Sequence, residues 1–355
     1  MQVTFLTRKF PPARGGMETF SFELTRRYPE EHTILHHGQR QRDIVWAAPL
    51  LLIRALLRKR STALYHLGDL VLVPLAPLLS RLTKRPIVVT VHALELLYDS
   101  WLLQWFINRS LDSVSHFVAV SSFTRQLLVD RGVSENRISV IPHGVEAPAV
   151  VDHDAARKKL DSVLNLPKDR LLICTVGRLI RRKGVAWFIE HVLPQIQNGN
   201  PLYLVASCGP DHSHIESVIQ KCGMSDSVRL LGKVSDDLLR DIYAGVDMFV
   251  VPNIRVPHDA EGFGFVAVEA AAAGLPVIAA RLEGITEAIH QGENGTLVEP
   301  EDADAFVAAI AHLAQNKATR RKLGQRAREY TKEHFRWDDI AQHYADLFDE
   351  LIQRV

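Results

Sequence analysis

Cysteine is scarce in this sequence, and long apolar runs are missing. The 355 residues include only Cys174, Cys208 and Cys222, with no Cys-x-x-Cys pair, so we expect neither a disulfide framework nor a zinc site. This usage fits the reducing cytoplasm best. No segment reaches the roughly 18 uninterrupted apolar residues that a spanning helix needs. Residues 1–7 lack the basic and apolar regions of a secretory signal, and we expect none.

Excess charge is also missing. The net charge is +1, which gives no indication of a nucleic-acid partner. The two halves differ, since residues 1–150 hold 18 Lys+Arg against 12 Asp+Glu (+6) and residues 151–355 hold 24 against 29 (−5). A hydrophobic share of 47% and a charged share of 23% are typical of globular chains. The length predicts two domains.

A nicotinamide fingerprint is absent as well. The first predicted strand, Val3 to Thr7, leads to Gly15-Gly16 and an amphipathic segment, without Gly-x-Gly-x-x-Gly. This disfavours an oxidoreductase. A strand, a Gly-Gly loop and a helix can still bring backbone N–H groups to a phosphate. A tight turn explains the two glycines equally well.

The stretch from Asp259 to Ala270 contains two glutamates eight residues apart, Glu261 and Glu269, around Gly262-Phe263-Gly264. It lies between a predicted buried strand and a predicted helix, residues 265–273, that ends at a Gly and Pro pair. The free N–H groups at a helix start attract anions. One carboxylate on the loop and one on the helix could then hold hydroxyls of a sugar and of a ribose.

A second stretch places cations after a buried strand. Residues 171–176 lead into Gly177-Arg178, and Lys183-Gly184 follow. Glycine permits close approach, arginine binds phosphate through two donors, and lysine adds a point charge. The pattern predicts a diphosphate site. We expect Arg182, like its neighbour Arg181, to be solvated.

His92 ends another predicted strand, at the edge where open α/β sheets bind ligands. His212 and His214 have no third metal-binding partner nearby, so we expect them in a loop. Residues 40–60 form a basic, apolar segment with six Arg or Lys and one Asp. Two interpretations stay open for it: docking on an anionic membrane, or an ordinary helix with solvated arginines.

Together, these motifs resemble glycosyltransferase family 4, whose members are retaining enzymes with the GT-B fold. The resemblance covers nearly the whole chain. Glu-x7-Glu with Glu261-Gly262-Phe263-Gly264 matches the family, as does Gly-Arg-Leu-x-x-x-Lys-Gly at residues 177–184. The chain departs from the family pattern at His143, where asparagine is usual, and at Ser207, where glycine is usual.

The family implies an α/β fold of two Rossmann-like doubly wound domains that face a central cleft. We expect an acceptor domain at residues 1–160 and a donor domain at residues 165–336. The final helix, residues 337–355, would cross back and pack on the first domain.

The resemblance also assigns roles. The catalytic residues implied are His92, Arg178, Lys183 and Glu261. The donor-binding residues implied are Gly15, Gly16, Gly177, Gly209, Lys233, Val234, Gly262, Phe263, Gly264 and Glu269. A nucleoside-diphosphate sugar would be the co-substrate, with no further cofactor. No Asp-x-Asp metal clamp accompanies these motifs, and we expect no essential metal.

The acceptor expected is a lipid-linked or cell-surface polysaccharide precursor, met at the cytoplasmic face of the membrane. Two alternatives remain. A phosphorylase or sugar-phosphate synthase would use the same Arg178 and Lys183, and a non-catalytic subunit would only bind the nucleotide sugar.

Overall fold

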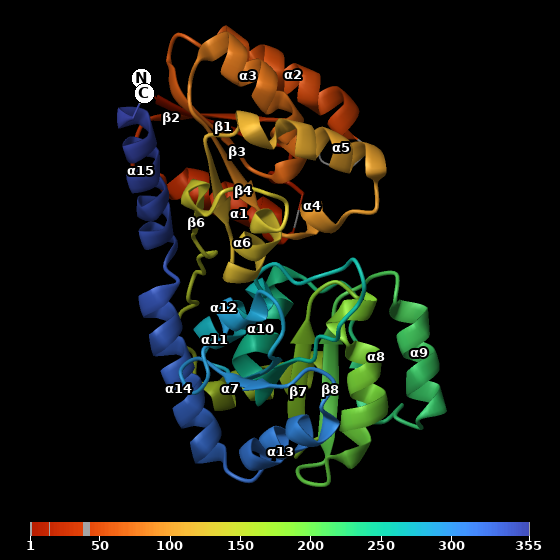
Figure 1. Ribbon diagram of the computed structural model, residues 1–355. Coiled ribbons are helices and arrows are strands. Elements are labelled where there is room, and N and C mark those ends of the chain that lie inside the picture. The colour runs from red at the N-terminus through yellow and green to blue at the C-terminus, as the bar shows by residue number, and fades with distance from the viewer. Residues whose placement is uncertain (1, 14, 38–42, 355) are drawn as a thin grey trace. The chain divides into compact units, whose positions relative to one another are not determined.

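The computed structural model describes residues 2–13, 15–37 and 43–354 (Figure 1). The chain forms two compact units. Unit 1 comprises Met1–Gly144, Ala260–Phe263 and Phe335–Val355, and unit 2 comprises Val145–Asp259 and Gly264–His334. The helix α7 (His153–Leu164) covers the boundary that we expect between residues 160 and 165, and it belongs to unit 2.

Unit 1 is built on a parallel sheet with the strand order β2-β1-β3-β4-β5-β6. The strands are β1 (Gln2–Thr7), β2 (His32–His36), β3 (Thr62–Leu67), β4 (Ile87–Val91), β5 (His116–Ala119) and β6 (Ile138–Val140). β3 and β4 are buried along their whole length, because helices cover both faces of such a sheet. The order of the strands reverses between β1 and β3.

Two sets of helices cover this sheet. On one face, α1 (Gly16–Arg27) packs against α15 (Trp337–Gln353), and the Tyr344 hydroxyl of α15 lies 3.0 Å from Thr90 Oγ1 on β4. The other face carries α2 (Ile44–Leu57), α3 (Ala76–Thr83), α5 (Trp101–Ser110) and α6 (Ser122–Val129). All four of these helices contribute side chains to one hydrophobic core. Shorter helical segments are η2 (Leu70–Leu75), α4 (Leu94–Leu97), η3 (Leu111–Ser113) and η4 (Glu135–Arg137).

Unit 2 has a second six-stranded parallel sheet, with the order β12-β11-β10-β7-β8-β9. The strands are β7 (Leu171–Val176), β8 (Pro201–Ala206), β9 (Val228–Leu230), β10 (Met248–Val251), β11 (Val277–Ala280) and β12 (Thr296–Val298). Counted from the start of unit 2, this is the 3-2-1-4-5-6 order of the Rossmann fold. The order reverses between β7 and β10, where such sheets bind their ligands.

The helices of unit 2 follow the strands in turn. They are α7, α8 (Val185–Trp187), α9 (His212–Lys221), α10 (Asp236–Gly245), α11 (Phe265–Ala272), α12 (Ile285–Ala288), α13 (Ala303–Ala314) and α14 (Lys317–His334), with η5 (Arg181–Lys183), η6 (Phe188–Val192) and η7 (Leu193–Gln195) between them. The expected helix after Gly264 is confirmed as α11. His212 and His214 lie on α9 rather than in the expected loop.

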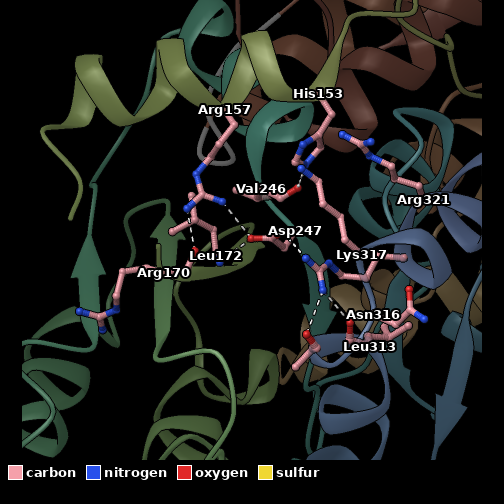
Figure 2. A network of polar contacts seen from close by, with 12 residues as sticks. His153, Arg157, Arg170, Leu172, Val246, Asp247, Leu313, Asn316, Lys317 and Arg321 are labelled. Carbon is pink, nitrogen blue, oxygen red and sulfur yellow. Dashed lines mark hydrogen bonds and ion pairs between the residues drawn. The ribbon is translucent and has the colours of Figure 1, made fainter. Parts of the chain in front are cut away.

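A buried carboxylate holds the amino ends of the two central strands of unit 2 (Figure 2). Asp247 Oδ2 accepts hydrogen bonds from the backbone N–H of Leu172 at 2.9 Å and from Arg157 at 3.0 Å. Its Oδ1 accepts one from Arg320 at 3.0 Å. These bonds tie α7 and α14 to β7 and β10. A buried charge needs such partners, and the network fixes the strands whose opposite ends carry the site.

Candidate functional site

In unit 2, the predicted cations lie at the carboxyl end of β7. Gly177 has a φ of +133°, which disfavours any residue with a side chain. A Cβ atom at Gly177 would lie 3.6 Å from Lys183 Cε and 3.8 Å from Lys183 Nζ. The buried Lys183 side chain therefore lies beside Gly177, and the next residue, Arg178, is exposed.

The same loop packs closely on the neighbouring strand. A Cβ atom at Gly184, which has a φ of +66°, would lie 1.8 Å from the carbonyl oxygen of Pro252. Pro252 directly follows β10, so the loop sits where the strand order reverses. Arg182, which we expected to be solvated, is buried and pairs with Asp259 at 2.8 Å. That expectation is wrong, because the ion pair anchors the loop.

Two more loops lie at this edge of the sheet, because they follow parallel strands. After β8, a Cβ atom at Gly209 would lie 2.2 Å from the carbonyl oxygen of Leu179, so this loop packs directly on the first one. After β9 come the exposed Lys233 and the half-buried Val234. Ser235 then caps α10, its Oγ accepting a hydrogen bond from the Leu238 N–H at 3.2 Å.

Glu269 lies on α11, the helix that starts after Gly264, whose φ is +87°. The hydroxyl of Tyr243 donates a hydrogen bond to Glu269 Oε2 at 3.1 Å. Burial raises the pKa of Glu269 to about 7, although the hydrogen bond from Tyr243 opposes the shift. This carboxyl group therefore changes its protonation near neutral pH. As a carboxylate it can accept hydrogen bonds from hydroxyl groups, and in its protonated form it can donate one to them.

The front of the Glu-Gly-Phe-Gly stretch belongs to unit 1. A Cβ atom at Gly262 would lie 2.2 Å from the carbonyl oxygen of His92, and Ser121 Oγ donates a hydrogen bond to the Gly262 carbonyl at 2.7 Å. Phe263 stacks on His143 with ring centroids 5.2 Å apart. The half-buried Glu261 is thus held at the carboxyl ends of β4 and β5, whereas Gly264 and Glu269 belong to unit 2.

His92, one of the catalytic residues that the family resemblance implies, lies buried after β4. Its Nε2 is 3.2 Å from the Gly68 carbonyl oxygen, and its Nδ1 is 3.2 Å from His143 Nε2. Burial lowers the pKa of His92 to about 4. The ring is therefore neutral at physiological pH, with Nε2–H donating to Gly68 and Nδ1 accepting from His143. His92 cannot supply a positive charge there.

Residues that sequence reasoning missed surround His92. Arg8, after β1, pairs with Asp69, after β3, at 2.9 Å, and both are buried. Glu95 accepts a hydrogen bond from the His92 N–H at 3.2 Å, and burial raises the pKa of Glu95 to about 7. Each of these residues comes directly or within a few positions after a predicted strand, which was the available signal.

Gly15 and Gly16 begin α1. A Cβ atom at Gly15 would lie 2.6 Å from Glu18 Oε2, and Glu18 pairs with Lys9 at 3.1 Å. At Gly16, a Cβ atom would meet no atom within 4 Å. The open space at this helix start is therefore beside Gly16, and a carboxylate lies against Gly15.

Two Asp-x-Asp sequences, at residues 152–154 and 302–304, lie at the starts of helices α7 and α13. Asp152 and Asp302 accept hydrogen bonds from the N–H groups of Ala155 and Ala305, at 2.7 and 2.9 Å. In residues 2–13, 15–37 and 43–354, no three His, Cys, Asp or Glu side chains are grouped to hold a metal. Over the same residues, no helix has the length and apolar character needed to cross a bilayer.

Comparison with known proteins agrees with this architecture. Residues 156–330 match the family described as glycosyl transferases group 1, and residues 1–147 match glycosyltransferase family 4. The structure of Anabaena Alr3699/HepE in complex with UDP superposes with a TM-score of 0.80 and 17% identity, covering 99% of this chain and 100% of that one. Sucrose-phosphate synthase from Thermosynechococcus elongatus gives 0.81 and 23%, with both chains fully covered.

Curated relatives extend the match. A GDP-mannose-dependent alpha-(1-6)-phosphatidylinositol monomannoside mannosyltransferase of Mycobacterium tuberculosis is 29% identical over 68% of this chain. The matched segment spans 63% of that relative's length. Its namesake in Mycolicibacterium smegmatis is 25% identical over 96% of this chain and 97% of its own. The family matches, together with the two Rossmann-like units, identify the chain as a glycosyltransferase with the GT-B fold. Within that class, the chain belongs to glycosyltransferase family 4.

Proposed function

We propose that this glycosyltransferase moves a hexosyl group from a nucleoside-diphosphate sugar to an acceptor hydroxyl, with retention of anomeric configuration. In this proposal, Arg178 and Lys183 bind the diphosphate. Glu261 holds hydroxyls of the donor sugar, Glu269 binds the ribose, and His92 positions the acceptor side as a neutral group.

The observation that carries the proposal is the loop at residues 177–184. It brings a glycine with positive φ, an exposed arginine and a buried lysine to the point where the strand order of unit 2 reverses. Backbone can approach a diphosphate at Gly177, and the two cations can offset the charge that grows on the departing nucleoside diphosphate. We propose that this occurs without an essential metal or another cofactor.

The remaining donor contacts follow the neighbouring loops. Gly209 and Gly177 bring backbone close to the donor, and Lys233 and Val234, after the edge strand β9, meet the nucleotide base. Gly262, Phe263 and Gly264 present backbone to the sugar, and Gly15 and Gly16 are further donor-binding residues in this proposal. The identity of the base is open between GDP, named for the mycobacterial relatives, and UDP, present in the Anabaena structure.

The acceptor in this proposal is a lipid-linked or cell-surface polysaccharide precursor. The mycobacterial relatives are named for a phosphatidylinositol monomannoside acceptor. The first 150 residues of this chain carry a net charge of +6, which favours approach to anionic lipid. The protein would act on the cytoplasmic side, peripheral to the inner face of the membrane.

A thermal-shift panel with UDP, GDP, ADP and their sugars tests the donor site. A nucleotide at 100 times its Kd should stabilise the protein by about 2.7 kcal/mol. Arg178→Ala should lose the shift, and Arg181→Ala, which alters an exposed arginine on the same loop, should keep it. If no nucleotide shifts the wild type at millimolar concentration, the donor site is wrong.

Product analysis then tests the reaction. NMR of the glycoside formed should show the anomeric configuration of the donor. Formation of a free sugar phosphate from the donor and inorganic phosphate would instead support the phosphorylase alternative. Nucleotide binding without any transfer would support the non-catalytic one.

A further inference from the structure

Unit 1 exposes a concentration of large apolar side chains. Among the described residues, fourteen large apolar side chains are at least 36% exposed, and ten of them lie on α2, α3 and α5. These ten are Trp46, Leu50, Ile53, Leu57, Leu78, Leu82, Trp101, Leu102, Trp105 and Phe106. We call this group the outer face. Such a concentration marks an interaction surface rather than chance exposure.

The helix α2 is apolar on both sides. Ala47, Leu51 and Ala55 are fully buried against the sheet. Away from the sheet, exposed residues recur at helical spacing from Trp46 (79% exposed) to Leu57 (80%). An apolar stripe directed to water contributes nothing to the folding of unit 1. A helix that is apolar all round is expected only where a second apolar phase covers it.

The three helices present their exposed residues on the same side of unit 1. Leu51 of α2, Leu79 of α3 and Ile107 of α5 belong to one core on one face of the sheet. The exposed residues of these helices point away from that core. In Figure 1, α2 and α3 run side by side over this face, and the two helices are in contact.

Positive charge borders the outer face. The segments 44–60, 76–86 and 101–113 contain one acidic residue, Asp112, and eight basic ones: Arg54, Arg58, Lys59, Arg60, Arg81, Lys84, Arg85 and Arg109. All eight lie near the carboxyl ends of their helices. Because these helices connect parallel strands by right-handed crossovers, their carboxyl ends lie at one edge of the sheet. Arg40 and Arg42, the other two cations of the segment predicted to be basic, lie outside the described residues.

We propose that the outer face of unit 1 docks on an anionic lipid bilayer, with Trp46, Trp101 and Trp105 at the level of the headgroups and the cations on lipid phosphates. Trp prefers that level because its ring is apolar and its N–H is polar. An isologous contact between two copies would pair this positive border with itself, so charge favours lipid over a second copy. The docking rests on the proposed function for its purpose, which is access to a lipid-linked acceptor.

Vesicle binding tests the docking. The full-length protein is mixed with vesicles of phosphatidylcholine alone or with added phosphatidylglycerol, and bound protein is measured by cosedimentation. Binding should require phosphatidylglycerol and weaken with salt. The emission of the tryptophans should shift to shorter wavelength on binding, since three of the five in the chain lie on the outer face.

Paired variants identify the surface. The change Trp101→Ser with Trp105→Ser should weaken binding about tenfold for each ring removed. Replacing Arg58, Lys59 and Arg60 by Gln should weaken it roughly fivefold for each charge. The matched controls are Val163→Ser, on an exposed valine of α7, and the replacement of the exposed Lys158, Lys168 and Lys322 of unit 2 by Gln. These controls should bind as the wild type does, and all variants should keep the wild-type melting temperature.

Two results would overturn the docking. One is the absence of binding to phosphatidylglycerol vesicles by the wild type, or binding by the Trp and the Arg/Lys variants that is as strong as that of the wild type. The other is a dimer in sedimentation velocity that the Trp variant dissociates, which would assign the face to a second copy. Nucleotide-induced thermal shifts are read on the same samples. If the protein does not bind vesicles but the nucleotides still raise its melting temperature, only the docking is refuted. If the protein binds vesicles but no nucleotide raises its melting temperature, only the proposed function is refuted.

Discussion

Unit 1 and unit 2 each surround a six-stranded parallel sheet with helices, yet the side chains on the outer helices of the two units differ. In unit 2, α7 and α14 are joined by ion pairs, from Asp247 to Arg157 and Arg320 and from Asp154 to Lys317 and Arg321. In unit 1, the helices of the outer face present tryptophan and leucine to their surroundings. The same architecture therefore leaves a polar, self-paired surface on one unit and an apolar surface on the other.

The two units also differ in the residues at the carboxyl ends of their strands. In unit 2, this edge brings the exposed Arg178 and the buried Lys183 around a glycine loop. In unit 1, the equivalent edge buries ionisable side chains against one another, with Arg8 on Asp69 and His92 between Gly68 and His143. One edge is arranged to receive an anion, and the other is largely occupied by its own side chains.

The largest effect that we expect comes from the ion pairs of unit 2. Asp247→Asn should lower the free energy of unfolding of unit 2 by about 3 kcal/mol, because it leaves Arg157 and Arg320 without their shared buried partner. Hydrogen exchange measured by mass spectrometry would report this on β7 and β10. The matched change Asp154→Asn breaks pairs that are about half exposed and should cost much less, because solvent screens exposed ion pairs. Equal effects would contradict the distinction between buried and exposed pairs.

The second effect concerns catalysis. Lys183→Ala should reduce kcat by roughly 100-fold or more, because a preorganised charge at the leaving group contributes most in the transition state. Steady-state kinetics with the donor identified by thermal shift would measure it. Arg181→Ala serves again as the control on the same loop. A change confined to KM would mean that Lys183 only helps to hold the donor in its ground state.

The sequence predicted the strand-end motifs better than it predicted the helices. The glycine-rich stretches at residues 177–184 and 262–264 were both placed correctly on loops, because a buried strand, a glycine and a charged residue form a local pattern. The helix α5 was not predicted, since WLLQWFINRS has apolar residues on both sides and shows no helical period. The helix α7 was not predicted either, because only Ala156 and Leu160 are buried on it. Its contact with the sheet is stabilised by the ion pair between Arg157 and Asp247 rather than by a long apolar face.

Long-range contacts limited the prediction of the site. Eight residues separate Glu261 from Glu269, and no local signal assigns them to different units. The burial of Arg8, Asp69 and Glu95 depends on three strands that meet only in the folded sheet. The fold class and the family were predicted in full because they rest on motifs, whereas the pairing of charges was not.

The third prediction uses the histidines of unit 1. Burial lowers the pKa of His66 to about 3 and that of His92 to about 4. A lowered pKa means that the unfolded chain binds protons first, so stability is full above the ordinary value of about 6.5 and is lost as the pH falls. At pH 5, each histidine should cost unit 1 roughly 2 kcal/mol. Hydrogen exchange at pH 7 and pH 5 should show protection falling in β3 and β4 more than in β7 and β10.

A variant checks the assignment. His66→Gln keeps a hydrogen-bond partner for Thr90 Oγ1, which lies 2.8 Å from His66 Nε2, and it removes one titrating group. It should reduce the acid sensitivity of unit 1 only in part, because burial also lowers the pKa of His92, His116 and His143. If unit 2 loses protection as fast as unit 1 on acidification, the buried histidines do not control the difference between the units.

The smallest effect should appear at Glu269. Because burial raises its pKa to about 7, the affinity for the donor should change across neutral pH as this carboxyl group ionises. A ligand that accepts a hydrogen bond from the protonated carboxyl prefers low pH, and one that donates to the carboxylate, as a ribose hydroxyl does, prefers high pH. We therefore expect nucleotide binding to strengthen a few-fold from pH 6 to pH 8. The change Glu269→Gln should abolish this pH dependence. The change Tyr243→Phe should move the midpoint of the pH dependence upward, since the Tyr243 hydroxyl lowers the pKa of Glu269. Calorimetric titration with the stabilising nucleotide at several pH values measures both. A wild-type affinity that does not change over this range would remove Glu269 from the ribose contact and leave the cations beside Gly177 as the determinant of donor binding.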